Sequence, residues 1–270
     1  MSLLHAVVLG VVQGLTEFLP ISSSAHLRIV PAFLGWADPG APFTAVTQLG
    51  TLAALLVYFR VDLWRIARAW TGGLINPAIR RTLEARLGWY IGLGTIPIAV
   101  LGVMFRSEIE NGARSLPLIG ATLVVFGLLL LAADRLGHRR RGVGTLNTRD
   151  AVMIGIAQAA ALVPGVSRSG ATISAGLLCG LERAAAARYS FLLSVPAVVL
   201  SGLFQLRTLN GSGADLTATV VATLLAFVTG YASIALLLRF LAHHSTSPFV
   251  VYRVVVGLLV LSLAGAGVIT

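Results

Sequence analysis

The chain has 270 residues, of which 57% are hydrophobic and only 11% are charged, whereas an average soluble domain has about 25% charged residues. Its mean hydropathy of +0.90 excludes an ordinary soluble protein and predicts a helical integral membrane protein. The net charge is +10, and all 20 basic residues are arginine. These arginines lie between apolar runs, so we interpret them as topology signals and expect no nucleic acid as a partner.

Six apolar runs are close to the length of roughly 20 residues that a helix needs to cross a bilayer. They lie at about 43–59, 88–105, 116–134, 189–206, 217–238 and 249–269. Two shorter runs, at about 4–19 and 151–163, each end at a proline-containing break. We therefore expect six spans and two helical hairpins that enter the membrane without crossing it.

The two broken segments repeat each other at a constant spacing. Equivalent residues are 145 positions apart in three pairs, which are Gln13 and Gln158, Ser22 and Ser167, and Ser24 and Ser169. Each segment is an apolar helical run, a break and then a cluster of hydroxyls. Broken helices at bilayer depth are tolerated only where they line a cavity or are buried in protein, so the repeat predicts a buried polar site.

The arginines also predict how the chain crosses the membrane. Two connections rich in arginine, within 60–86 and 135–149, are expected on the cytoplasmic side, and the charge-balanced turn at 106–114 is expected outside. The first broken segment is then re-entrant from outside and the second from inside. An interfacial helix within 60–86 is an alternative that the sequence leaves open.

We therefore predict one all-α polytopic membrane domain, residues 1–270, with an inverted-topology repeat. Repeat 1 covers about 1–134, a cytoplasmic linker about 135–149 and repeat 2 about 150–270. Each half is one re-entrant helix hairpin plus three transmembrane helices, and an odd number of spans inverts the second copy. Such folds place their site between the repeats, near the midplane.

Ionisable side chains within apolar segments are costly, and their default interpretation is functional. Those outside the loops are Glu17, His26, Arg28, Arg168 and Arg253. Gln13 and Glu17 are four residues apart, so they share one face of a helix. Arg253 begins the last span, where it either supports the site or extends to the membrane surface.

Each hydroxyl cluster is expected to open a new helix after its break. Two helix N-termini would then meet, and their free N–H groups and dipoles favour an anion, phosphate especially. Arg168 adds a permanent charge with a planar fork that matches phosphate oxygens. The predicted phosphate-binding residues are Ser22, Ser24, Ser167, Ser169, Gly170 and Thr172, with Gln13 and Arg253 in support.

Two motifs combine these residues. They read Gln13-Gly-Leu-Thr-Glu17 followed by Pro20-Ile-Ser22-Ser23-Ser24-Ala25-His26, and Pro164-Gly165-Val-Ser167-Arg168-Ser169-Gly-Ala-Thr172. Here the chain resembles the bacitracin-resistance (BacA-type) undecaprenyl pyrophosphate phosphatases, from about residue 6 to about 260. Gln13 stands where that family often has Glu, and Ser24-Ala25 replaces its common Thr-Gly.

The resemblance implies hydrolysis of undecaprenyl diphosphate to undecaprenyl phosphate plus inorganic phosphate, which recycles the lipid carrier for cell-wall synthesis and confers bacitracin resistance. It implies the bacterial cytoplasmic (inner) membrane, a polyprenyl diphosphate lipid as substrate among the membrane lipids, and a divalent cation, Mg²⁺ or Ca²⁺, at Glu17. Because the first hairpin is expected to open outward, we expect an active site open to the external, periplasmic face. A homodimer stays open as the assembly.

We predict Glu17, Ser23, His26 and Arg168 as catalytic residues. Arg168 holds the terminal phosphoryl group, Ser23 (with Ser22 as the weaker alternative) attacks it, and Glu17 or His26 takes the serine proton. Direct attack by water stays open, and so does a lipid-phosphate transporter or flippase that uses the same inverted-repeat site. All of these hypotheses require Glu17 and Arg168 to lie close together.

Overall fold

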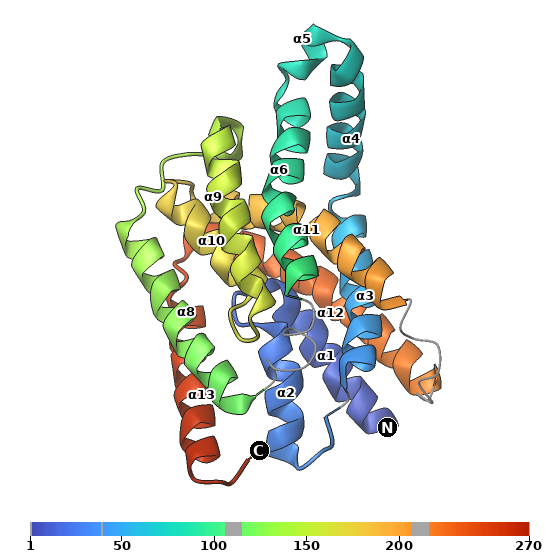
Figure 1. Ribbon diagram of the computed structural model, residues 1–270, viewed down its shortest axis with the longest axis vertical. Helices are drawn as coiled ribbons and strands as arrows, with labels where there is room; N and C mark the ends of the chain where they lie inside the picture. Colours follow the sequence, from blue (N-terminus) through green and yellow to red (C-terminus); the bar gives the residue numbers. More distant parts are fainter. Residues whose placement is uncertain (1, 39, 106–114, 207–215, 270) are drawn as a thin grey trace.

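The computed structural model describes residues 2–38, 40–105, 115–206 and 216–269. These ranges are helical, with one isolated bridge between Arg141 and Leu181 and no named strand (Figure 1). The helices are α1 Leu3–Phe18, α2 Ser23–Leu34, α3 Gly40–Tyr58, α4 Arg60–Ile75, α5 Pro77–Arg80, α6 Leu83–Met104, α8 Leu116–Leu136, η1 Val143–Thr145, α9 Thr148–Ala159, η2 Ala160–Leu162, α10 Arg168–Leu178, α11 Arg183–Leu206, α12 Leu216–His243 and α13 Ser247–Gly265.

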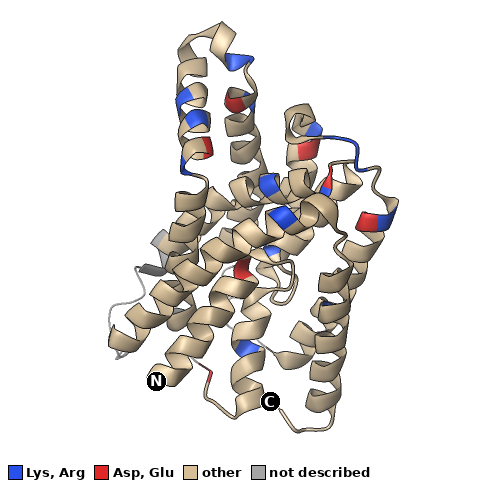
Figure 2. Ribbon diagram, turned by 180° about the vertical axis from the view of Figure 1, so that it is seen from behind, with Lys and Arg blue, Asp and Glu red and all other residues tan. Residues whose placement is uncertain are grey.

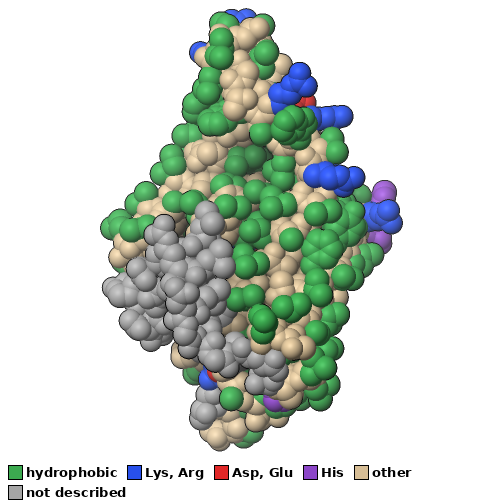
Figure 3. Space-filling model, turned by 90° about the vertical axis from the view of Figure 1, so that its right-hand side faces the viewer, with side chains coloured by type: hydrophobic (Ala, Val, Ile, Leu, Met, Phe, Trp, Pro, Cys, Tyr) green, Lys and Arg blue, Asp and Glu red, His purple; other side chains and the backbone are tan. Residues whose placement is uncertain are grey.

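The predicted spanning runs all lie in long helices. By length and composition, α6, α8, α11, α12 and α13 can each cross a membrane, and α3 together with α4 meets the same test as a pair bent by 73°. Apolar side chains cover much of the surface between the two ends of the molecule in Figure 3. A multi-pass helical membrane protein is therefore confirmed. The expected outward turn at 106–114 lies outside the described residues.

The basic segment 60–86 is helical and forms α4, α5 and the first turn of α6. Together with α6, these helices make a hairpin that projects beyond the neighbouring helices (Figure 1). Most arginines gather at this end of the molecule, on the hairpin and on the connection between α8 and α9 (Figure 2). The helices of this segment agree with the alternative of a helix within 60–86, and their position at the membrane surface stays a prediction.

Each broken segment has the predicted hydroxyl-capped helix start after its proline. The caps, Ser22 and Ser167, have closely similar and unusual backbone angles, with φ of 77° and ψ of 100° at the first and φ of 71° and ψ of 115° at the second. Both side chains accept the backbone N–H three residues later, from Ala25 at 3.4 Å and Gly170 at 3.1 Å. A positive φ in a residue with a Cβ costs about 1–3 kcal/mol, so the same strained turn occurs twice.

A buried carboxylate fixes the ends of three helices. Asp134, at the end of α8, accepts Arg183 Nε at 2.7 Å and the backbone N–H and hydroxyl of Thr246 at 2.9 Å each. Arg183 begins α11 and Thr246 precedes α13. This link sets the start of α13, the helix that carries Arg253.

Helices α6 and α9 approach so closely that backbone meets backbone. A Cβ added at Gly155 would lie 2.5 Å from Gly94 Cα and 2.6 Å from Gly94 O. Neither atom belongs to a flexible side chain, so only a shift of the helices could make room. This contact holds the second broken segment against α6.

We expect Gly155→Ala to lower the midpoint of thermal aggregation of the purified protein by roughly 3–8 °C, because overpacking typically costs about 1–3 kcal/mol. Gly92→Ala is the matched control, since nothing lies within 4 Å of a Cβ at that helical position. It should leave the midpoint unchanged or slightly higher. Equal midpoints for both variants would contradict the close approach of α6 and α9.

Candidate functional site

The tips of the two broken segments meet at an ion pair. Arg168, the first residue of α10, donates from Nη2 to Glu17 Oε1 near the end of α1. Both side chains are largely buried, with Glu17 6% and Arg168 18% exposed. The predicted meeting of the acid from one segment with the guanidinium from the other is confirmed. Arg168 Nε and Nη1 make no hydrogen bond within the described ranges and remain available to a ligand.

Glu17 also organises its own segment. Its Oε2 accepts the Ser23 hydroxyl at 2.6 Å and Gln13 Nε2 at 3.1 Å. Of the hydroxyls predicted for the site, Ser23 is the one that donates to this carboxylate. A carboxylate at this distance can take the proton of a serine that attacks an electrophile. The Ser23 hydroxyl and the Arg168 guanidinium thus share one acidic side chain, that of Glu17.

The remaining predicted hydroxyls form two similar turns around this centre. Ser22 and Ser24 lie 3.2 Å apart between Oγ atoms, and Ser167 and Ser169 lie at the same distance. Ser169 Oγ also donates to Leu19 O at 3.1 Å, which joins the second turn to the first break. The turns therefore lie against each other.

The predicted N–H donor Gly170 has a different role from the one expected. Its N–H donates to Ser167 Oγ at 3.1 Å, so the helix cap already uses it. Thr172 bonds at 2.6 Å to the Ser190 hydroxyl and donates at 2.8 Å to Arg168 O. Thr172 therefore supports the turn around Arg168 through the backbone.

Helix α11 adds two residues that are not among the predicted site residues. Ser190 and Ser194 line a small cavity with Glu17, Arg168 and Ser169. Ser194 does donate to its own helix, to Phe191 O at 2.8 Å, whereas Ser190 reaches α10. Their spacing of four residues on one helix face was the signal that could have identified them.

His26 is buried and both of its ring nitrogens are engaged. Nδ1 lies 2.7 Å from Ser22 O, and Nε2 lies 2.7 Å from the Tyr252 hydroxyl. A carbonyl only accepts, so Nδ1 carries a proton and, in the neutral ring, Nε2 accepts from Tyr252. Within the described residues His26 makes no hydrogen bond to Ser23 or Glu17. Of the two predicted bases, Glu17 is the one that contacts the Ser23 hydroxyl.

Arg253 is fully buried and ties both breaks together. Its guanidinium donates to five carbonyl oxygens, at distances of 3.0–3.4 Å. They belong to Pro20 in the first break, Gly165 and Val166 in the second, and Thr122 and Leu123 in α8. Extension of this side chain to the membrane surface, one of its two interpretations, is therefore wrong, and the supporting role is the one observed.

The site carries two guanidinium groups and one carboxylate, together with the N-terminal ends of α2 and α10. All of these groups other than Glu17 favour an anion. The net charge of the site is therefore positive. The site is largely shielded from water, and Coulomb interactions are stronger there than at a surface. The arrangement can bind a phosphate group next to a serine whose proton has an acceptor.

The site offers few ligands for a metal ion. Within the described ranges no group of three or more His, Cys, Asp or Glu side chains is close enough to hold one. Glu17 is the carboxylate at the centre, and Gln13 Oε1 beside it is buried without a hydrogen-bond partner. Magnesium sites often combine one or two carboxylates with phosphate oxygens of the substrate. Glu17 and Gln13 therefore fit a cation only if phosphate oxygens of a substrate supply further ligands.

Fold and site together define a multi-pass membrane protein with an acid–serine–arginine site buried among its helices. The family model of bacitracin resistance protein BacA matches residues 6–259. The chain belongs to this family.

Three relatives extend over nearly the full length of the chain. An undecaprenyl-diphosphatase of a Nocardioides species is 54% identical over 98% of this chain and 98% of that protein. The undecaprenyl-diphosphatase of Thermobifida fusca is 51% identical over 100% of this chain and 93% of its own length. That of Nocardia farcinica is 50% identical, with coverage of 100% and 98%.

We expect Arg253→Lys to lower the free energy of unfolding by about 3 kcal/mol, because an ammonium with three donors leaves buried carbonyls without partners. The relative position of the two breaks should change as well, because they lose the guanidinium that bonds to both. Chemical unfolding followed by tryptophan fluorescence measures the effect. Arg239→Lys, at an exposed position of α12, is the control and should behave like the unchanged protein.

Proposed function

We propose that the chain hydrolyses undecaprenyl diphosphate to undecaprenyl phosphate and inorganic phosphate at the Glu17–Arg168 site. The observation that carries this proposal is the contact of one carboxylate with both Ser23 and Arg168. The relatives named undecaprenyl-diphosphatase support it over the full chain length. A polar site among membrane helices suits a substrate whose tail stays in lipid, and the family name connects the activity with bacitracin resistance.

In the proposed reaction, the free donors of Arg168 bind the terminal phosphoryl group and neutralise its charge. Ser23 Oγ attacks the terminal phosphorus while Glu17 takes the hydroxyl proton. The bond from phosphorus to the bridging oxygen breaks, and undecaprenyl phosphate leaves. Glu17 passes its proton to the departing phosphate oxygen and is a carboxylate again. Water then attacks the phosphoserine and Glu17 accepts a proton from that water. The bond from phosphorus to Ser23 Oγ breaks, Glu17 returns the proton to this oxygen, and inorganic phosphate is released.

His26 has a positioning role in this proposal. Its bond to Ser22 O stiffens the turn before Ser23, and the Tyr252 hydroxyl fixes the ring from the other side. The alternative in which His26 takes the serine proton would require the ring to leave both partners. Ser22 is a weaker nucleophile candidate than Ser23, because its hydroxyl oxygen accepts the Ala25 N–H as a helix cap.

We further propose an inverted-topology repeat, with repeat 1 at about 1–134, a cytoplasmic linker at about 135–149 and repeat 2 at about 150–270. The matching turns at Ser22 and Ser167 support the repeat. The gathering of arginines at the hairpin end supports a cytoplasmic position for that end (Figure 2). The site would then open to the external face of the bacterial inner membrane. A homodimer is not required, because every residue in the proposed reaction lies in one chain.

We propose that Glu17 and Gln13 Oε1 would hold a divalent cation, Mg²⁺ or Ca²⁺. It would supply additional neutralisation of the diphosphate charge. The orphaned Gln13 oxygen is the observation that favours it. Phosphate release should fall when a chelator is added and return with excess Mg²⁺ or Ca²⁺.

Arg168→Ala and Glu17→Ala should each lower phosphate release from undecaprenyl diphosphate by roughly 10²–10³, because each removes a group that stabilises the reacting phosphoryl or its nucleophile. The assay uses purified protein in detergent, where transport between compartments contributes nothing. Arg149→Ala, at an exposed position near the start of α9, is the control. More than a tenth of normal turnover in Arg168→Ala would overturn the assignment.

The covalent route predicts a phosphoserine at Ser23. Substrate labelled in its terminal phosphate, mixed with the enzyme and quenched in acid during turnover, should leave label on a peptide containing Ser23. Ser23→Ala should abolish the label, and Ser24→Ala should retain it. A normal enzyme that turns over without ever carrying label would favour direct attack by water.

A further inference from the structure

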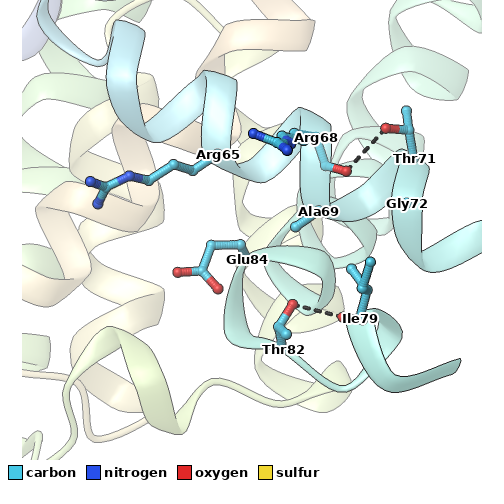
Figure 4. Close-up of a pocket in the computed structure, with 8 residues that line it drawn as sticks. All are labelled: Arg65, Arg68, Ala69, Thr71, Gly72, Ile79, Thr82 and Glu84. Atoms are coloured by element: carbon cyan, nitrogen blue, oxygen red, sulfur yellow. Dashed lines mark hydrogen bonds between the residues drawn. The ribbon is translucent and has the colours of Figure 1, made fainter. Parts of the chain in front are cut away.

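A second polar cavity lies outside the candidate active site, in the projecting hairpin. It has a volume of about 540 Å³ and opens between α4 and the α5–α6 turn (Figure 4). Arg65, Arg68 and Thr71 contribute to it from α4, and Thr82 and Glu84 from the start of α6. None of these residues takes part in the proposed reaction.

The two arginines of this cavity are free cations. The hairpin segment 60–86 contains six arginines against Asp62 and Glu84. Asp62 is already paired with Arg188 at 2.7 Å. Within the part of the chain that the structure describes, the side chains of Arg65 and Arg68 make no hydrogen bond and no ion pair, and both are exposed.

Two other arginines of the hairpin use their donors on backbone carbonyls. Arg80 donates to Gly73 O at 2.9 Å, and Arg86 donates to Leu146 O at 2.7 Å. The first bond lies within the hairpin, and the second joins the hairpin to the connection between α8 and α9. Both guanidinium groups therefore already have partners. Arg65 and Arg68 are three residues apart on α4, so their side chains leave the same face of the helix. Their free donors match the oxygens of a phosphate group.

The surroundings of the cavity are those of a membrane surface. Trp64 is 68% exposed, Trp89 43% and Ile75 89%, all on the same hairpin. Tryptophan and arginine on a helix with exposed apolar side chains are typical of the lipid headgroup region. The cytoplasmic leaflet carries anionic lipids, which attract basic segments close to the membrane.

Glu84 favours a singly charged occupant over a multiply charged one. Figure 4 shows its carboxylate on the α6 side of the opening whose α4 side carries the two arginines. A free phosphate or diphosphate would bring two or more negative charges next to this carboxylate. A phospholipid phosphodiester brings one, and its acyl chains can lie against the exposed tryptophans.

We infer that this cavity binds the phosphate headgroup of an anionic phospholipid of the cytoplasmic leaflet, with Arg65 and Arg68 as its ligands. The inference relies on the proposed orientation in the membrane and is independent of the proposed reaction. Anionic lipid bound here would anchor the hairpin at the membrane surface.

The test measures lipid selectivity in the full-length protein. Three of the four tryptophans, Trp64, Trp70 and Trp89, belong to this region, so their fluorescence reports lipids that contact it. The protein is reconstituted in phosphatidylcholine nanodiscs with increasing amounts of brominated phosphatidylglycerol or brominated phosphatidylcholine, which quench tryptophan on contact. We expect phosphatidylglycerol to be preferred about tenfold over phosphatidylcholine, from two arginines that each favour anionic lipid.

The variants should shift this preference in opposite directions. Arg65→Gln with Arg68→Gln should reduce it to near equality, and Glu84→Gln should increase it several-fold by removing a like charge from the cavity. Arg81→Gln, an exposed arginine of the same hairpin that does not line the cavity, should leave it unchanged. Phosphate release in detergent should be normal in all of these variants.

Three results would overturn the inference. One is an equal effect of Arg81→Gln, which would mean general attraction of charge to the membrane surface. Another is displacement of phosphatidylglycerol by millimolar inorganic phosphate, which would make the cavity a site for free anions. The third is a preference for phosphatidylglycerol that is unchanged or lower in Glu84→Gln. This single variant tests the cavity even if the double arginine variant fails to fold.

Discussion

Arg253 lies fully buried between two chain breaks, and its guanidinium satisfies carbonyl oxygens from both of them. A helix that breaks within a membrane leaves backbone groups without partners, and each such group costs several kcal/mol in hydrocarbon. One planar cation with five N–H donors can satisfy several carbonyls at once, which an ammonium cannot do. The breaks can therefore exist only where this side chain reaches them, and it fixes their distance from each other and from α8.

Glu17 gains its chemical role from the same arrangement. On its own helix it would be an isolated acid among apolar residues, and its nearest helical partner, Gln13, offers one hydrogen bond. The second break brings Arg168 to one carboxylate oxygen, and the turn after the first break brings Ser23 to the other. A carboxylate held between a cation and a hydroxyl is oriented for proton transfer before any substrate arrives. Such preorganisation is the main source of rate enhancement in phosphoryl transfer, because the protein has little covalent chemistry to supply there.

Arginine serves three separate physical tasks in this chain. At the site it is buried and either satisfies backbone carbonyls, as Arg253 does, or pairs with Glu17, as Arg168 does. At the hairpin end it holds connections together, for example where the Asp150 carboxylate accepts a hydrogen bond from Arg141 at 2.6 Å and raises the pKa of that guanidinium. On the face of α4 it is unpaired, and the charge is available to a lipid phosphate. Burial and available partners distinguish these tasks.

The sequence by itself determined the helical membrane fold, because long apolar runs have no other stable form in lipid, and it determined the two hydroxyl-capped breaks, because proline and serine act locally. It also indicated that Glu17 and Arg168 belong together, since isolated charges at that depth require partners. The tertiary structure decided the rest. The choice of Glu17 over His26 as the partner of Ser23 depends on the Tyr252 hydroxyl, 226 positions away from His26. The contribution of Ser190 depends on how α11 packs against α10, and the role of Arg253 depends on five carbonyls from three separate segments. Such contacts are made between helices whose relative rotation and depth are set by packing across the whole molecule, and no local pattern of residues specifies them.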